Sequence, residues 1–382
     1  MVLMTLFALL SSQPAVIGTD GDDLPVAARL LDDGTIAVVL QTFHQNEPMS
    51  YGVTAVNPGD LVPEIMPVET GFEDPLWTSG CAWISDSSFT ILLSSADGQN
   101  PGEILVCTMD DEPSVSARFA VPPSPSPGEG METGISSLVC AFPDGFLMTS
   151  DSYADGWDDF QAKTLFRLGP HAETIWSAEV PCSGWWMNPD LIRTLPDGGC
   201  AVASDEDGFS ETLFLSRFSA TGERLWSMEY TTGGEMTHHM MELLPAPAGG
   251  LLAVGVTDLF TMRDHAFILL VDSTGTIVSE TVEDGPGNLR LTCGLALPDG
   301  RFLLAGWTSE AGEYPMDRPG ITDCLVTVDA GGAVEALTTL SGSDRQPCFL
   351  LPDGNGVVLV GMMPSTDSDG SDVYVERLEE IP

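Results

Sequence analysis

The residues in this chain that could do chemistry gather in a few polar loops, and the most regular of these is the run DSDGSD at 367–372. It places carboxylates at alternating positions, as oxygen-rich calcium-binding loops do. Asp367, Asp369 and Asp372 are therefore the candidate metal ligands. The run lacks the glutamate that an EF-hand places at its twelfth position, so a solvated acidic loop is the favoured alternative. Calcium is the one cofactor that the sequence leaves open.

Two further acidic loops contain Asp151, Asp155, Asp158, Asp159, Asp205 and Asp207. Two carboxylates that converge in a pocket can act as general acid and base on a polysaccharide. The chain has neither a G-x-S-x-G nor an H-E-x-x-H motif, so catalysis finds no other support. A polysaccharide hydrolase or lyase is thus the alternative function, and the sequence favours a protein that is not an enzyme.

Tryptophans in the segments between repeats form a second group of candidate ligand-binding residues. Trp77 is one, and Trp185 and Trp186 form a pair in the segment SGWWMNPD, which also contains Asp190. An exposed indole can stack on a sugar or a cation, whereas a buried one would cap the ends of the neighbouring strands. Adjacent residues of an extended loop face opposite ways, so we expect one indole of the pair to be buried and the other exposed.

The third group contains Glu235, His238, His239 and Glu242. This spacing could supply two or three metal ligands if the segment bends. In an extended strand His238 and His239 would point to opposite faces, which rules out a shared metal. We keep both histidines as candidate ligand-binding residues.

The elements that must position these residues are repeats. A turn with the pattern PDGG or a variant of it follows a short apolar strand seven times, at Gly34, Asp86, Gly145, Gly198, Gly249, Gly300 and Gly354. Proline presets φ for a tight turn and glycine supplies positive φ, so each turn predicts a hairpin. Each turn precedes a second apolar strand and then a third. The pattern predicts an all-β, seven-bladed β-propeller of four-stranded antiparallel blades.

The unit at 190–230 shows where the working face of such a blade would lie. Its turns 196–199 and 220–223 are short, whereas the connection between its second and third strands, 205–211, is longer and polar. In a propeller, the connections between the second and third strands share one side with the links between blades. Binding usually resides in variable loops on a rigid scaffold, so we expect ligands on that side.

The seventh repeat stops directly after its third strand, at 372–378. An unpaired strand edge is a liability, so we expect residues 12–19 to supply the missing outermost strand. We assign 13–382 to a single propeller domain. Residues 1–12 are apolar and too short to span a bilayer, and they resemble the core of a signal peptide although no basic residue precedes them. This interpretation predicts a secreted or periplasmic protein. The alternative is that residues 1–12 form an edge strand of the propeller.

The net charge of −44, with Lys163 as the only lysine, excludes nucleic acid as a partner and disfavours anionic membrane surfaces. We interpret it as a property of the whole surface rather than as a site. Arg29, Arg193, Arg290 and Arg345 lie on or before the innermost strands, where they could line a central channel or pair with the surplus acid.

Eight cysteines show no C-x-x-C pair, so a zinc site is disfavoured. The favoured interpretation is buried thiols packed between blades, with disulfides as the alternative.

The pattern LPDGG, an apolar run ending in Gly255, Gly306 or Gly361, then TGE and a tryptophan resembles the repeats of uncharacterised secreted bacterial β-propeller proteins. The resemblance covers about residues 24–380 and implies the fold. The function that we expect is non-enzymatic binding or scaffolding outside the cytoplasm, by a monomer without membrane insertion. Its ligand would be a protein or a carbohydrate, bound through the long-loop side.

Overall fold

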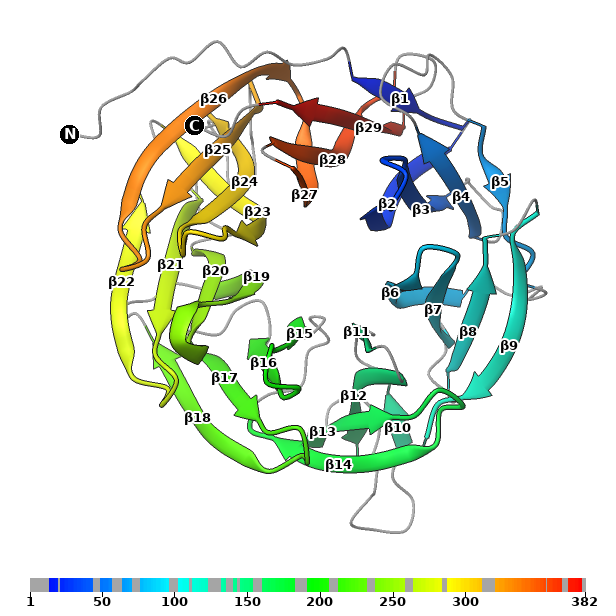
Figure 1. Cartoon of the computed structure of the whole chain (residues 1–382), viewed down its shortest axis with the longest axis horizontal. Coiled ribbons are helices and arrows are strands. Elements are labelled where there is room, and N and C mark those ends of the chain that lie inside the picture. Colours follow the sequence, from blue (N-terminus) through cyan, green and yellow to red (C-terminus); the bar gives the residue numbers. More distant parts are fainter. Residues whose placement is uncertain are drawn as a thin grey trace. The chain divides into compact units, whose positions relative to one another are not determined.

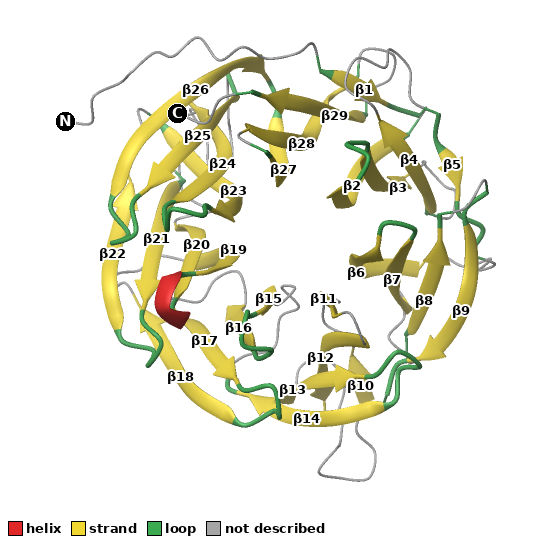
Figure 2. Ribbon diagram, viewed as in Figure 1, coloured by secondary structure: helices red, strands yellow, loops and turns green. Residues whose placement is uncertain are grey.

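The computed structural model describes most of the chain, and all structural statements below concern these residues. They are 14–19, 21–43, 49–56, 64–70, 76–95, 102–109, 112–122, 132–134, 140–142, 145–153, 160–182, 191–205, 212–231, 238–257, 264–283, 287–310, 320–354, 356–365 and 370–379. No helix among them has the length and apolar character needed to cross a membrane. The only helix in this part of the chain is one turn of 3-10 helix, Pro247–Gly249 (Figure 2).

The strands form seven antiparallel sheets, which are the blades of a seven-bladed β-propeller (Figure 1). Blade one contains β2 (Asp22–Leu30), β3 (Ile36–Phe43), β4 (Ser50–Val56) and β5 (Met66–Pro67). Blade two contains β6 (Leu76–Ser85), β7 (Ser88–Ser95), β8 (Glu103–Thr108) and β9 (Ser114–Ala120). Blade three contains β10 (Glu132–Gly134), β11 (Cys140–Phe142), β12 (Gly145–Tyr153), β13 (Phe160–Leu168) and β14 (Thr174–Val180). Its innermost position is shared by β10 and β11, which both pair with β12.

The other blades repeat this order. Blade four contains β15 (Leu191–Thr194), β16 (Cys200–Asp205), β17 (Thr212–Phe218) and β18 (Arg224–Thr231). Blade five contains β19 (His238–Pro245), β20 (Leu251–Thr257), β21 (His265–Val271) and β22 (Ile277–Glu283). Blade six contains β23 (Asn288–Ala296), β24 (Phe302–Ser309), β25 (Thr322–Val328) and β26 (Val334–Ser343). Blade seven contains β27 (Gln346–Asp353), β28 (Gly356–Pro364), β29 (Ser371–Leu378) and β1 (Ala15–Ile17). The predicted fold class is therefore confirmed.

The chain divides into two compact units. The larger contains residues 1–46, 52–66 and 237–382, and so holds blades five, six and seven with most of blade one. The smaller contains 47–51 and 67–236, and so holds blades two, three and four. Each is described below by itself.

The tight turns follow from their glycines and aspartates. Gly198 has φ of 79° in the turn of blade four, a conformation that glycine adopts without steric cost. Its N–H donates to the Leu195 carbonyl at 2.9 Å, and Asp197 Oδ1 accepts from the Gly199 N–H at 3.0 Å. Arg217 Nη2 donates to the other oxygen of Asp197 at 2.6 Å, which ties the turn to the third strand.

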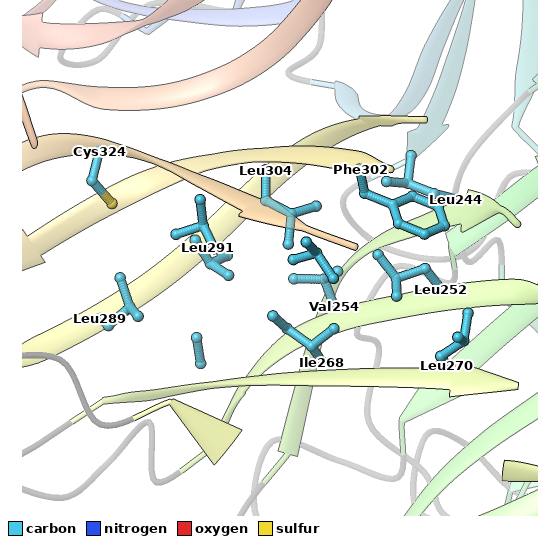
Figure 3. Close-up of a cluster of buried hydrophobic side chains, with 13 residues drawn as sticks. Leu244, Leu252, Val254, Ile268, Leu270, Leu289, Leu291, Phe302, Leu304 and Cys324 are labelled. Carbon is cyan, nitrogen blue, oxygen red and sulfur yellow. The ribbon is translucent and has the colours of Figure 1, made fainter. Parts of the chain in front are cut away.

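Within each unit the core lies between successive sheets, because the second strands are apolar on both faces. All seven residues of β20 and all eight of β24 are buried. Figure 3 shows the cluster that they form between blades five and six, in which Leu252 and Val254 meet Leu291 and Leu304. Burying each such side chain contributes about 1.5–3 kcal/mol, so these contacts hold neighbouring blades together.

A β-bulge recurs in the innermost strands. The register shifts by one residue at Pro25/Ala27, Thr78/Gly80, Met240/Glu242, Leu291/Cys293 and Pro347/Phe349. In blades five, six and seven the glycine that ends the second apolar run lies opposite the bulge, at Gly255, Gly306 and Gly361. A Cβ at each of these glycines would overlap a carbonyl oxygen of the innermost strand, so the bulge explains why the repeat has glycine there.

The expected outermost strand of blade seven is present. β1 pairs antiparallel with β29, with Ala15 opposite Val375 and Ile17 opposite Val373, and the two strands lie side by side in Figure 1. Ile17 is buried in the core shared with blade one. The pairing predicted from the missing fourth strand is thus confirmed.

Candidate functional site

The predicted site residues divide into those that the structure places and those outside the described part. Asp190, Asp367 and Asp369, together with Trp185 and Trp186, lie outside the described residues. The predictions that concern them, including the calcium loop and the indole platform, remain predictions.

Trp77 lies within β6, paired with Ser94, so it belongs to an innermost strand and not to a connecting loop. Asp372 lies in β29 and is buried. Gly18 leaves the room for its carboxylate, because a Cβ there would overlap the Asp372 carboxylate.

His238 and His239 begin the extended strand β19, opposite Thr257 and Val256. Consecutive residues of a strand face opposite sides, and His239 is half-buried. The bend that would bring both to one metal does not occur at this point. Across the described ranges, no three His, Cys, Asp or Glu side chains are grouped so that they could hold a metal ion.

Buried polar clusters instead mark the base of the long-loop side in the larger unit. The first, the Asn288 cluster, joins blades five and six. Asn288 is fully buried at the start of β23, where its Oδ1 accepts from the Asp264 N–H at 2.8 Å. Its Nδ2 donates to Ser309 Oγ and to the Glu310 carbonyl, both at 2.9 Å. One side chain therefore fixes the residue before β21 and the end of β24.

The second, the Arg345 cluster, joins blades six and seven. Arg345 lies directly before β27 and is buried. Its Nη2 donates to Asp323 Oδ2 at 2.6 Å and also to Glu376 Oε2. Its guanidinium carbon lies 4.1 Å from the centre of the Tyr374 ring. A Cβ at Gly361 would lie 2.7 Å from that ring, so the glycine lets the ring pack against β28.

The Arg345 cluster carries an excess of negative charge. One guanidinium faces two carboxylates, and Asp323 is fully buried. Burial raises the pKa of Asp323, against the opposing effect of Arg345, and the charge on Glu376 raises it further. Within the described residues, Asp323 Oδ1, Arg345 Nε and Tyr374 Oη have no hydrogen-bond partner. The cluster is thus a buried, incompletely satisfied polar network.

The third, the Asp23 cluster, joins blades seven and one. Asp23 is fully buried and accepts from the Thr19 N–H and from Thr42 Oγ1, each at 2.6 Å. The neighbouring Asp22 Oδ1 accepts from the Ser371 N–H at 3.0 Å, and Ser371 Oγ donates to the Asp23 carbonyl at 3.2 Å. The start of β29 is therefore held by the start of β2.

The three clusters follow one rule: a polar residue at or just before an innermost strand binds the beginning of the third strand in the preceding blade. Four residues of these clusters were not among the predicted site residues: Asp323, Glu376, Asn288 and Asp23. The sequence feature that could have indicated these clusters is the polar residue that precedes or begins the first apolar strand of each of these repeats. Arg345, which we expected either in a channel or paired with acid, pairs with acid.

This arrangement does not suit hydrolysis. Asp323 and Glu376 converge, but on Arg345, and their side chains are 0% and 5% exposed. A substrate could not reach them, so these carboxylates have a structural role. In the smaller unit Asp151 and the chain's only lysine, Lys163, likewise form a buried pair at 3.7 Å across β12 and β13.

Cysteine chemistry is also disfavoured by burial. Cys81, Cys107, Cys324 and Cys348 are free thiols. Burial raises the pKa of Cys107 and of Cys348 to about 12, so neither is a thiolate near neutral pH. Cys107 and Cys324 are buried and pack as small apolar side chains, whereas Cys81 and Cys348 are half-buried.

Comparison with known proteins supports the fold and nothing finer. No family model matches the sequence, and no curated protein matches it. The β-propeller domain of the Trilobed protease from Pyrococcus furiosus is similar, with a TM-score of 0.50 and 9% identity, over 95% of this chain and 97% of that one. A member of the DUF4221 family from Bacteroides vulgatus gives a TM-score of 0.49 at 9% identity, over 97% of both chains. A protein of unknown function from Dyadobacter fermentans gives 0.44 at 14% identity, over 99% and 97%. At 9% identity, the likeness to the Trilobed protease domain establishes a shared fold alone.

Proposed function

We propose that this protein is a non-enzymatic binding or scaffold propeller that recognises a protein or carbohydrate through the loops between its second and third strands. The observation that carries the proposal is the set of three polar clusters, which fix the strand ends at the base of those loops. The segments between these ends differ in length, from 258–263 to 311–319, while the turns on the opposite side repeat one pattern. Variable loops on fixed ends are the usual arrangement of a binding surface.

The remaining parts of the proposal concern ligand and location. A chain with a net charge of −44 favours neutral or basic ligands. We place the protein outside the cytoplasm on the apolar segment 1–12, and we keep calcium as a candidate ligand of the loop at 367–372. We also propose that the protein is a monomer and that it binds neither nucleic acid nor membranes.

Loop replacement tests the working side. Residues 258–263 and 311–319 are each replaced by Gly-Ser segments of equal length, and the variants are compared with wild type on glycan and peptide arrays. We expect unchanged melting temperatures and loss of whichever signal the wild type shows. Thr221→Ala, in an exposed turn of the other kind, is the control and should bind normally. An array signal that survives both replacements would overturn the proposal, as would the lack of any wild-type signal.

The paired indoles give a sharper test of the same side. If Trp185 or Trp186 caps the blades, its replacement by alanine lowers the free energy of unfolding by about 3–5 kcal/mol. If it belongs to a binding platform, stability stays near wild type and retention on the array is lost. We expect one residue of each kind. Strong destabilisation by both replacements, without any ligand signal that depends on either, would refute the platform.

A further inference from the structure

In the described part of the chain, one kind of strand carries the large exposed apolar side chains. Among the described residues, the large hydrophobic side chains that are well exposed all lie on the outermost strands of blades three, four, five and seven. They are Ile175, Leu225, Ile277, Val278, Val282 and Val16. Outermost strands also carry unpaired backbone groups: in the described part of the chain β14 pairs only with β13, and β18 only with β17. Such edges are ready templates for an added strand.

Blades three and four, both in the smaller unit, repeat the same surface in the same register. ETIWSAEV at 173–180 matches ERLWSMEY at 223–230. From Ile175 and from Leu225 onward alternate residues are exposed, so each strand presents an apolar residue, a serine and a glutamate. A second exposed glutamate precedes each strand directly, in the turn that leads into it. These exposed residues are Glu173, Ile175, Ser177 and Glu179 in blade three, and Glu223, Leu225, Ser227 and Glu229 in blade four. Ile175 is 55% exposed and Leu225 is 50% exposed.

Contacts on the inward side hold the two strands in place. Trp176 Nε1 donates to the Ala220 carbonyl at 3.0 Å, which links β14 to the turn that leads into β18. A Cβ at Gly222 would lie 2.7 Å from the Trp176 ring, so that turn packs directly on the indole. Val180 and Tyr230, near the ends of the two strands, are buried. A ligand would therefore meet preorganised edges.

We propose that the outer edges of β14 and β18 each bind an extended basic peptide segment as an added β-strand. Main-chain hydrogen bonds supply affinity in this mode, and alternate side chains supply specificity. The fitting segment carries basic residues opposite the two glutamates and an apolar residue opposite Ile175 or Leu225, all on one face.

Charge favours a basic peptide segment over a second copy of this chain as the ligand of these edges. A second copy has a net charge of −44 and a single, buried lysine, so its edges would place glutamate against glutamate. Arg224 lies exposed beside Leu225, at the position that Thr174 occupies in blade three. We therefore expect the blade-three edge to bind a basic segment more tightly.

The test uses a fluorescein-labelled peptide with the core Lys-Thr-Val-Thr-Thr-Thr-Lys and measures fluorescence anisotropy with the full chain. Two control peptides separate the causes of binding. One has the same composition but places the lysines on opposite faces, and the other has N-methylated amides on alternate residues. We expect the first control to bind at least tenfold more weakly, and the second to lose binding.

Variants locate the binding surface. Glu179→Lys with Glu229→Lys should weaken binding at least tenfold, as should Ile175→Ser with Leu225→Ser, while the melting temperature stays near wild type. Glu310→Lys with Glu379→Lys makes the same charge change at exposed positions elsewhere and should have little effect. The loop replacements described above should also leave peptide binding intact, which separates this inference from the proposed function.

Three results would overturn the inference. Absence of binding by the lysine peptide would mean that the glutamates only protect the edges from aggregation. Equal binding of the peptide with displaced lysines would mean unspecific charge attraction. Equal binding by the Glu179→Lys, Glu229→Lys variant would place the peptide elsewhere.

Discussion

Replacing Arg345 by methionine tests whether the Arg345 cluster holds blades six and seven together. Methionine keeps much of the apolar volume but removes the cation that faces two buried carboxylates. Asp323 and Glu376 would then be left close together without a counter-charge.

The magnitude follows from the contacts that are lost. Nη2 of Arg345 donates to both carboxylates, and hydrogen bonds to charged groups contribute about 1.5–3 kcal/mol each. The guanidinium also lies over Tyr374, which adds about 0.5–2 kcal/mol. The new methionine contacts offset part of this loss. We expect the free energy of unfolding at pH 7 to fall by about 3–5 kcal/mol, the usual effect of removing one partner of a buried pair.

The assay is urea unfolding followed by tryptophan fluorescence at pH 7 and pH 5. Because protonation removes the buried negative charge, the deficit relative to wild type should shrink at pH 5. Adding Asp323→Asn and Glu376→Gln to the methionine variant should restore most of the stability. Arg301→Met is the matched control, since Arg301 makes its two ion pairs at the exposed surface. A loss at Arg345 no larger than at Arg301, or a loss that does not change with pH, would refute the reasoning.

Three more predictions use thermal melts. Because burial raises the pKa of Asp323 above its ordinary 3.8, the folded state keeps this proton after the unfolded chain has released it. The contribution of Asp323 to the free energy of unfolding is therefore fully present below pH 3.8, and it declines as the pH rises through the folded-state pKa. The total decline is about 1.4 kcal/mol for each pH unit by which the folded-state pKa exceeds the ordinary value. Asp323→Asn should flatten this part of the wild-type profile, and an unchanged profile would contradict it. Deleting residues 1–20 removes the buried Ile17 and exposes the edge of β29, so the melting temperature should drop substantially; an equal melting temperature would show that β1 contributes nothing. Sodium chloride below about 1 M should raise the melting temperature by screening the surplus acid, and calcium chloride at matched ionic strength should raise it further only if a calcium site exists. A melting temperature that responds to neither salt would show that repulsion among the surplus carboxylates does not limit stability.

The blades could be predicted from the sequence because their turns depend on local chemistry. Gly198 and its equivalents in five other repeats adopt positive φ, and an aspartate precedes the glycine in all of these turns but that of Gly249. The place of β1 was predictable for a topological reason, since the seventh repeat lacks a strand and only one segment could supply it. Both inferences need no knowledge of side-chain contacts.

The polar clusters could not be predicted in the same way. Arg345 meets Asp323 and Glu376 across 22 and 31 residues, and these pairs depend on how one sheet packs on the next. The bulges add a further difficulty, because one extra residue in an innermost strand reverses the alternation of faces beyond it. Trp77 was misplaced for a related reason: β6 begins at Leu76, earlier than its apolar pattern suggests.

The pairing of β1 with β29 also sets the order in which the protein can be completed. Ser371, the first residue of β29, donates to Asp22 across 349 residues of chain. Ribosomes add about 5–20 residues per second, so β1 waits on the order of tens of seconds before its partner is made. Blade seven must therefore be finished after translation has passed β29, in whatever order the other blades fold. A nascent chain halted before that point lacks the strand with which β1 pairs, so its seventh blade stays incomplete.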